Sequence, residues 1–145
     1  MYEYRVKVLK IIDGDTVDVD IDLGFGIVLT DERVRIMGID TPESRTSDPV
    51  EKVFGLASKA RLKELLGEEA VLLTQINKDG EDMKGKFGRI LGDFKCVVEG
   101  ESRTVSEVLI SEGHAVPYMG QSKEDVQGEH MANRERLIAE GKVEI

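Results

Sequence analysis

The sequence contains one cysteine, Cys96, and only two histidines among its 145 residues. A single cysteine cannot form an internal disulfide. Without a Cys-x-x-Cys pair or a group of histidines, the usual ligands of a structural zinc ion are also missing. These absences exclude disulfide-stabilised and zinc-dependent classes of protein, and we expect Cys96 to be a small buried or half-buried apolar side chain.

The chain also lacks a long apolar run. Apolar residues make up 40% of the sequence but are spread along it, and no stretch approaches the roughly 20 residues that a membrane-spanning helix needs. The first twelve residues alternate as in a strand and do not show the charge and hydropathy order of a secretory signal. We therefore expect a soluble protein of one domain, residues 1–145, without a membrane partner and located in the cytoplasm, or secreted if a signal has been removed.

Basic residues are outnumbered by acidic ones. The 20 lysines and arginines face 29 aspartates and glutamates, which gives a formal net charge of −9. General attraction to nucleic acid depends on basic side chains that release the counterions of phosphates. A nucleic-acid partner would therefore need a local basic site or a bound metal ion.

The apolar periodicity predicts strands first and helices later. Apolar and polar residues alternate between residues 2 and 37, where we expect three strands. A helix is expected over residues 48–67, with Asp48 as N-cap, Pro49 at the first position and Gly67 as the stop. The side chains expected to form its buried stripe are Val50, Val53, Phe54, Ala57, Leu62 and Leu65. The remaining elements are expected at residues 70–76 (strand), 89–100 (strand and turn), 104–113 (helix) and 122–141 (helix). This order suits the α+β class, with a small mixed barrel and helices packed on it.

The sequence "DGDT" at residues 13–16 precedes an alternating strand. By parity Asp15 lies on the same side as Val17 and Val19, so the strand directs this carboxylate inward, where a cation, an arginine or backbone amides must compensate its charge. Taken alone, the motif is best interpreted as a turn in which Asp15 accepts backbone hydrogen bonds. The other aspartates of this strand, Asp18, Asp20 and Asp22, are expected on its solvated face.

Two further motif matches lack residues that the motif requires. Counting an EF-hand from Asp18 places Leu23 where a glycine is needed and Leu29 where a glutamate is needed. Residues 80–87 resemble a phosphate-binding P-loop, but Phe87 stands where a serine or threonine must hold magnesium.

The sequence "RIMGIDTPE" at residues 35–43 carries a second group of acids. Asp40 and Glu43 follow a strand and Pro42 stiffens the turn, so these hard oxygen ligands suit calcium, although a plain turn remains an alternative. Simple alternation places Arg35 opposite Asp40. Both side chains can reach one site only if the chain bends, and Gly38 is the best place for that bend.

The densest basic cluster is "KGKFGR", which contains Lys84, Lys86 and Arg89. On its own it is best explained as a solvated loop. Combined with the carboxylates and with Arg35, it supplies what cleavage of a phosphodiester needs: a site for a divalent cation and two arginines for the phosphate.

The three motifs "DGDT", R-x4-DTPE and "FGR", in this order, resemble the staphylococcal nuclease (thermonuclease) family over about residues 8–118 and the last helix. The resemblance implies a five-stranded OB-fold barrel with three helices. It also implies calcium-dependent hydrolysis of DNA and RNA, in which water attacks phosphorus and the 5′ oxygen leaves, so that the products carry 3′ phosphates.

The resemblance further implies a role for each matching residue. Asp15 and Asp40 would bind calcium through their carboxylates and Thr41 through its backbone carbonyl, with Asp13 supporting these ligands from outside. Arg35 and Arg89 would hold the scissile phosphate, and Glu43 would orient or deprotonate the attacking water. Contacts with the substrate are implied for Lys86, Phe87 and Tyr118, where Phe87 replaces a usual tyrosine.

The expected partner is nucleic acid, single-stranded or frayed, bound by a monomer. Two other functions remain open at this point. The chain could be a non-catalytic OB-fold module that binds nucleic acid or protein, or a calcium-binding structural domain. The first alternative usually lacks the site carboxylates and arginines, and the second leaves the two arginines unexplained.

Overall fold

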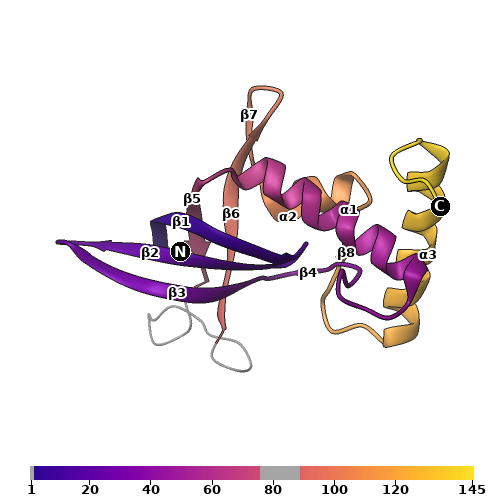
Figure 1. The fold of residues 1–145 in the computed structure, drawn as a ribbon, viewed down its shortest axis with the longest axis horizontal. Helices are drawn as coiled ribbons and strands as arrows, with labels where there is room; N and C mark the ends of the chain where they lie inside the picture. Colours follow the sequence, from indigo (N-terminus) through magenta and orange to yellow (C-terminus); the bar gives the residue numbers. More distant parts are fainter. Residues whose placement is uncertain (1, 76–88) are drawn as a thin grey trace.

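The computed structural model describes residues 2–75 and 89–145, and belongs to the α+β class that the sequence predicted (Figure 1). The predicted substrate contacts Lys86 and Phe87, and Lys84 of the basic cluster, lie outside the described residues. The elements in chain order are β1 (Tyr2–Asp13), β2 (Thr16–Gly24), β3 (Ile27–Ile36), β4 (Ile39–Asp40), α1 (Pro49–Leu66), β5 (Glu69–Thr74), β6 (Ile90–Val98), β7 (Glu101–Thr104), α2 (Val105–Ser111), β8 (Val116–Pro117) and α3 (Lys123–Ala139). Within this described part, no helix combines the length and the apolar character needed to cross a membrane.

The main sheet is mostly antiparallel and has the order β3-β2-β1-β5-β6-β7. A parallel pairing between β3 and β6 also joins Val34 to Ile90 and Arg35 to Leu91, so β3, β2, β1, β5 and β6 form a closed series of pairings. The short strands β4 and β8 pair in a second sheet that the sequence analysis did not predict. The β3–β6 pairing brings Arg35 close in space to Arg89, which directly precedes β6.

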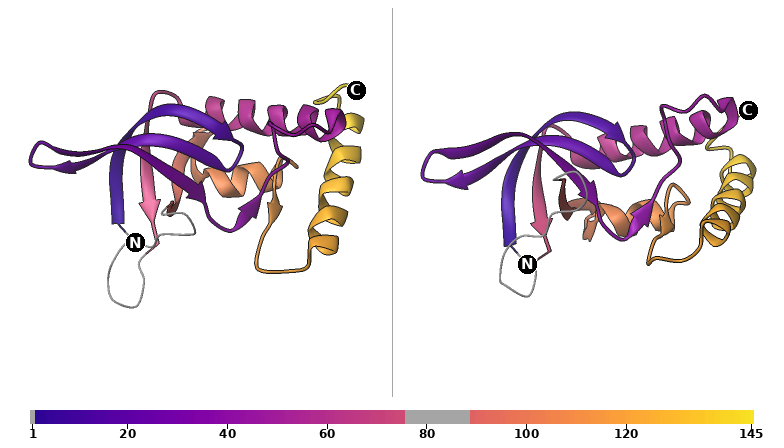
Figure 2. Two further views of the ribbon diagram at one scale, coloured as in Figure 1. Left: turned by 60° about the horizontal axis from the view of Figure 1, so that its bottom comes forward. Right: turned by 90° about the horizontal axis from the view of Figure 1, so that it is seen from below.

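The hydrophobic core lies between the sheet and the first two helices. Buried strand residues such as Val17, Val19 and Phe94 share one cluster with Leu62 of α1 and Leu109 of α2. Figures 1 and 2 show α1 and α2 together beside the sheet, with α3 beyond them.

The burial pattern confirms the prediction for Cys96 and shows where the alternation along β2 no longer corresponds to burial. Cys96 is buried as expected, and burial raises the pKa of its thiol. Leu23 has the parity of Val17 and Val19, yet its side chain is 40% exposed. The β2–β3 hairpin extends away from the helices (Figure 1), and apolar side chains at its tip, Phe25 and Ile27, are exposed as well.

Helix α1 begins and ends as predicted. The Asp48 carboxylate accepts hydrogen bonds from the amides of Val50 and Glu51, Pro49 opens the helix, and Gly67 follows its end with φ +67°. The predicted buried stripe was partly wrong, because Val50 is 37% exposed. The buried residues are Phe54, Gly55, Ser58, Leu62 and Leu66. The small residues Gly55 and Ser58 are buried because backbone segments approach the helix closely there.

Two glycines lie where other parts of the chain come too close to leave room for a side chain. A Cβ atom on Gly55 would lie 2.6 Å from the backbone nitrogen of Ser44 and closer still to the carbonyl of Glu43. A Cβ atom on Gly14 would lie 2.8 Å from the Cβ of Ser58 and 3.2 Å from Cγ2 of Thr41. Helix α1 therefore supports both the β1–β2 turn and the segment after β4.

We expect Gly55→Ala to lower the free energy of unfolding by about 1–3 kcal/mol, because the added methyl group meets backbone that cannot move freely. Alanine by itself would favour the helix by about 0.5–1 kcal/mol. Denaturant unfolding measures the difference. The matched control is Gly128→Ala in α3, where a Cβ would meet nothing within 4 Å and no loss is expected. An equal response of both variants would show that Gly55 is not tightly packed.

Candidate functional site

Most of the residues singled out in the sequence line one cavity of about 220 Å³. The cavity lies among the β1–β2 turn, the end of β3, the segment after β4 and the start of β6. Its lining residues are Asp13, Asp15, Thr16, Arg35, Asp40, Thr41, Pro42, Glu43 and Arg89. We call it the acidic cavity, because four carboxylates and two guanidinium groups face it. The excess of two negative charges is what one divalent cation would balance.

Arg35 lies between the two inner carboxylates of the acidic cavity. Its Nη2 atom is 3.4 Å from Oδ2 of Asp15 and 4.0 Å from Oδ1 of Asp40. The same nitrogen donates to the carbonyl of Ile39 at 2.9 Å, which orients the guanidinium. Gly38 has φ +80°, so the chain bends where the sequence analysis expected it to bend.

Asp15 points inward, as its parity predicted, and is only 9% exposed. Of the compensating groups considered for it, the structure provides an arginine, Arg35. Its Oδ1 atom also accepts a hydrogen bond of 2.8 Å from the hydroxyl of Thr16. The outer aspartates of β2 face away from the cavity, and Asp18 forms an ion pair with Arg33 instead.

Asp13 connects the end of β1 to the segment that carries the other acids. Its Oδ1 atom accepts hydrogen bonds from the backbone nitrogen of Ser44 at 3.2 Å and from the Ser44 hydroxyl. Ser44 directly follows Glu43. Glu43 itself is exposed, and no hydrogen bond or ion pair of its carboxylate occurs among the described residues.

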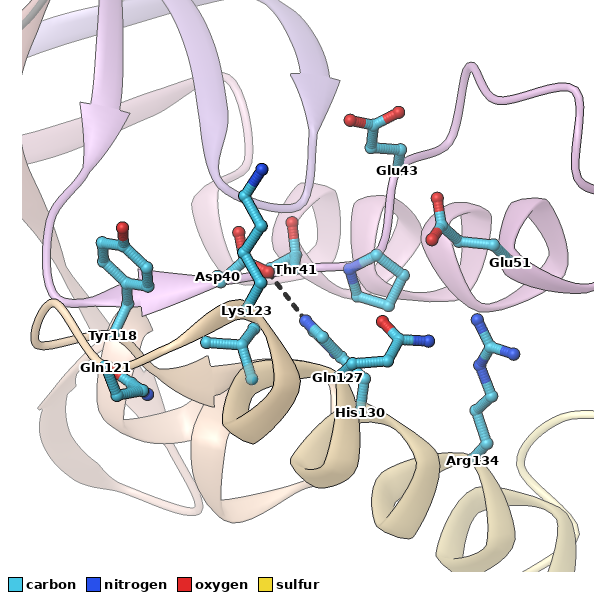
Figure 3. A pocket seen from close by; sticks show the side chains of 12 residues that line it. Asp40, Thr41, Glu43, Glu51, Tyr118, Gln121, Lys123, Gln127, His130 and Arg134 are labelled. Atoms are coloured by element: carbon cyan, nitrogen blue, oxygen red, sulfur yellow. Dashed lines mark hydrogen bonds and ion pairs between the residues drawn. The ribbon is translucent and has the colours of Figure 1, made fainter.

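A residue that the sequence analysis missed contacts Asp40 from the opposite side. His130 of α3 is 8% exposed, and its Nε2 atom lies 2.7 Å from Oδ2 of Asp40 (Figure 3). An ionised carboxylate only accepts, so the imidazole donates this hydrogen bond. Asp40 therefore directs Oδ2 to His130 and leaves Oδ1 on the side of Arg35. The available sequence signal was the helical spacing of Lys123, Gln127, His130 and Arg134, which places these polar residues on one face of the last helix.

The donors in the acidic cavity fit a hard divalent cation. Within residues 2–75 and 89–145, no group of three or more His, Cys, Asp or Glu side chains is placed to hold a metal ion. Asp15 and Asp40, which lie on either side of Arg35, would be the carboxylate ligands, and with carbonyl, hydroxyl and water oxygens they would make a set typical of calcium or magnesium. Thr41 adds an observation that favours a ligand in this cavity, because its buried Oγ1 atom has no hydrogen-bond partner in the described part of the chain.

A second cavity of about 360 Å³ adjoins the first and shares Asp40, Thr41, Pro42 and Glu43 with it. We call it the α3 pocket. Tyr118, which was predicted to contact substrate, lines the α3 pocket and not the acidic cavity, and is 48% exposed. The other lining residues are Glu51, Gln121, Lys123, Val126, Gln127, His130 and Arg134.

Comparison with known proteins gives one family. Residues 33–144 match the model of the family described as staphylococcal nuclease homologue. Micrococcal nuclease of Shigella flexneri is 28% identical over 144 residues, which cover 93% of this chain and 72% of that protein. Thermonuclease of Staphylococcus intermedius is 35% identical over 61% of this chain and 45% of its own length. The SPbeta prophage-derived endonuclease YokF of Bacillus subtilis (strain 168) is 31% identical over 81% of this chain and 38% of its own length.

Proposed function

Because the chain belongs to the staphylococcal nuclease family, we propose that it is a calcium-dependent nuclease that hydrolyses phosphodiester bonds of DNA or RNA. The observation that carries this proposal is the acidic cavity. It brings the predicted cation ligands Asp15 and Asp40 together with both predicted phosphate-binding residues, Arg35 and Arg89. The names of the three relatives support the same class of activity.

In this proposal Asp15, Asp40 and the carbonyl of Thr41 hold the calcium ion, with Asp13 keeping the segment after β4 in place. The bound ion would supply positive charge beside the scissile phosphate. The Arg35 guanidinium, which lies between Asp15 and Asp40, would donate to phosphate oxygens together with Arg89.

Glu43 would deprotonate the attacking water, because its exposed carboxylate can accept a proton from a water molecule. The water oxygen forms a bond to phosphorus as the bond to the 5′ oxygen breaks. The water gives its proton to Glu43, and the 5′ oxygen takes a proton from solvent. The products are a 3′ phosphate and a 5′ hydroxyl.

Cleavage of single-stranded DNA should require calcium. We expect purified protein to fragment a labelled oligonucleotide when calcium is present and to stop when a chelator is added in excess. Gel analysis of the fragments, with a phosphatase step to detect 3′ phosphates, measures both the activity and the bond that breaks. Protein that is folded by circular dichroism and binds the oligonucleotide without cleaving it would instead favour the non-catalytic module.

The two arginines should contribute to the rate more than to folding. We expect Arg35→Lys and Arg89→Ala each to slow cleavage by on the order of 10² or more, because each removes a positioned donor to the charge that develops on phosphate. Single-turnover rates at saturating calcium measure the loss. Arg33→Ala is the control, since Arg33 belongs to the same strand as Arg35 but pairs with Asp18 outside the acidic cavity. Turnover near the wild-type rate in either site variant contradicts its assigned role.

His130 should act on calcium binding as a positioning residue for Asp40. We expect His130→Ala to weaken calcium affinity by about 10- to 100-fold, as loss of a partner behind a metal ligand typically does. His130→Gln keeps a donor and should recover part of the affinity. Calorimetric titration with calcium, without substrate, measures this effect directly.

The control for His130 is Asn133→Ala on the same helix. The Asn133 amide donates to the carbonyl of Ala115 at 3.3 Å and does not contact Asp40. If Asn133→Ala weakens calcium binding as much as His130→Ala, the loss is caused by weaker docking of α3 as a whole, and the positioning role of His130 is wrong.

A further inference from the structure

Helix α3 turns a polar face toward the domain beside the acidic cavity. Figure 3 shows Lys123, Gln127, His130 and Arg134 extending from successive turns of α3 toward the segment that carries Asp40 and Glu43. Helices of globular proteins usually turn an apolar stripe inward. Of the residues of α3 only His130 and Leu137 are buried, and Leu137 packs with Phe54 and Val143, so the apolar packing of this face is confined to its C-terminal end.

The walls of the α3 pocket differ in charge. Asp40, Glu43 and Glu51 lie on the wall formed by the segment after β4 and by α1, whereas Lys123 and Arg134 lie on the wall formed by α3. In a chain with a net charge of −9, two cations on one wall of a pocket are a local exception. The side chain of Lys123 is exposed and forms no ion pair or hydrogen bond within the described residues, so its charge is available to a ligand.

Arg134 is positioned by an aromatic ring, and one of its nitrogen atoms lacks a hydrogen-bond partner in the described part of the chain. Its guanidinium lies over the ring of Phe54, with Cζ 5.4 Å from the ring centroid. Its Nε atom is buried and has no hydrogen-bond partner among residues 2–75 and 89–145. The contact with Phe54 therefore holds the Arg134 charge on the wall of the α3 pocket.

We propose that the α3 pocket is a subsite for the nucleic-acid strand next to the scissile phosphodiester, with Lys123 and Arg134 binding a backbone phosphate. This inference rests on the proposed nuclease function and extends it. The pocket volume of about 360 Å³ is within the range of about 300–1,000 Å³ typical of small-ligand sites, and suits one nucleotide unit. The side-chain amide of Gln127 on the same wall can donate to or accept from a base or sugar.

Continuity between the two cavities supports the assignment. The α3 pocket and the acidic cavity meet at Asp40, Thr41, Pro42 and Glu43, so a strand whose phosphate lies at Arg35 can continue directly along α3. The subsite therefore predicts a preference for substrates that extend beyond the bond being cut.

Binding without turnover provides the first test. Fluorescence anisotropy of a labelled single-stranded dodecamer of thymidylate, in chelator, measures affinity at several salt concentrations. We expect the double variant Lys123→Ala with Arg134→Gln to bind about 10-fold more weakly, with a salt slope smaller by about 0.7 for each phosphate that the protein no longer binds. Glu51→Gln removes a negative charge from the opposite wall and should strengthen binding. The control is Lys63→Ala, an exposed lysine of α1 that does not line the pocket.

Steady-state kinetics in calcium provide the second test. The double variant should raise KM for the dodecamer by about 10-fold while changing kcat little. It should leave kcat/KM for a dinucleotide, which has no phosphate beyond the scissile one, within about twofold of wild type. If Arg134→Gln disturbs the packing on Phe54, the same measurements are made on Arg134→Lys and on the single variant Lys123→Ala. Circular dichroism shows whether each variant is folded.

The outcomes separate this inference from the proposed function. A double variant that matches Lys63→Ala in affinity, salt slope and KM overturns the subsite, whether or not the protein cleaves DNA. Weaker binding by the double variant supports the subsite even if wild-type protein shows no cleavage, a result that would contradict only the nuclease proposal.

Discussion

The close contact between α1 and the backbone of residues 43–44 is the constraint on which the candidate site depends. Strand β4 has two residues, so its few ladder hydrogen bonds cannot hold the acidic segment by themselves. Gly55 allows the helix backbone to approach Glu43 and Ser44 within a distance that no other residue type permits. Glycine within a helix costs about 0.5–1 kcal/mol relative to alanine, and here that cost is offset by the support that α1 gives to the segment.

The same segment is held from two further directions. Asp13 at the end of β1 accepts hydrogen bonds from Ser44, and His130 of α3 donates to Asp40. Each contact joins residues that are 31 or 90 positions apart in the chain. The carboxylate of Asp40 is therefore oriented by the packing of elements from both ends of the protein. Such preorganisation is what a cation site needs, because ligands that are already oriented lose little entropy on binding.

Much of the fold and part of the site could be predicted because the relevant signals are local. Alternation along residues 15–19 predicted that Asp15 points inward, and it is buried. The capping residue Asp48 and the expected ranges 104–113 and 122–141 correctly predicted where the helices begin, and the structure shows Thr104 and Ser122 as the N-caps of the last two. The bend at Gly38 was predicted because simple alternation would place Arg35 and Asp40 on opposite sides of the chain. Other features had no local signal: His130 is one polar residue among many in α3, and the burial of Gly55 depends on a segment from elsewhere in the chain.

The sequence alone therefore determined the class of the fold, the ends of the helices and the set of acids and arginines, because capping and periodicity act over a few residues. Only the tertiary structure decided which of these groups meet. The parallel β3–β6 pairing brings Arg35 and Arg89 to one cavity, and the docking of α3 places His130 against Asp40 and forms a polar pocket beside it. These contacts arise from the packing of distant elements, and such packing depends on shape and burial across the whole domain rather than on neighbours in sequence.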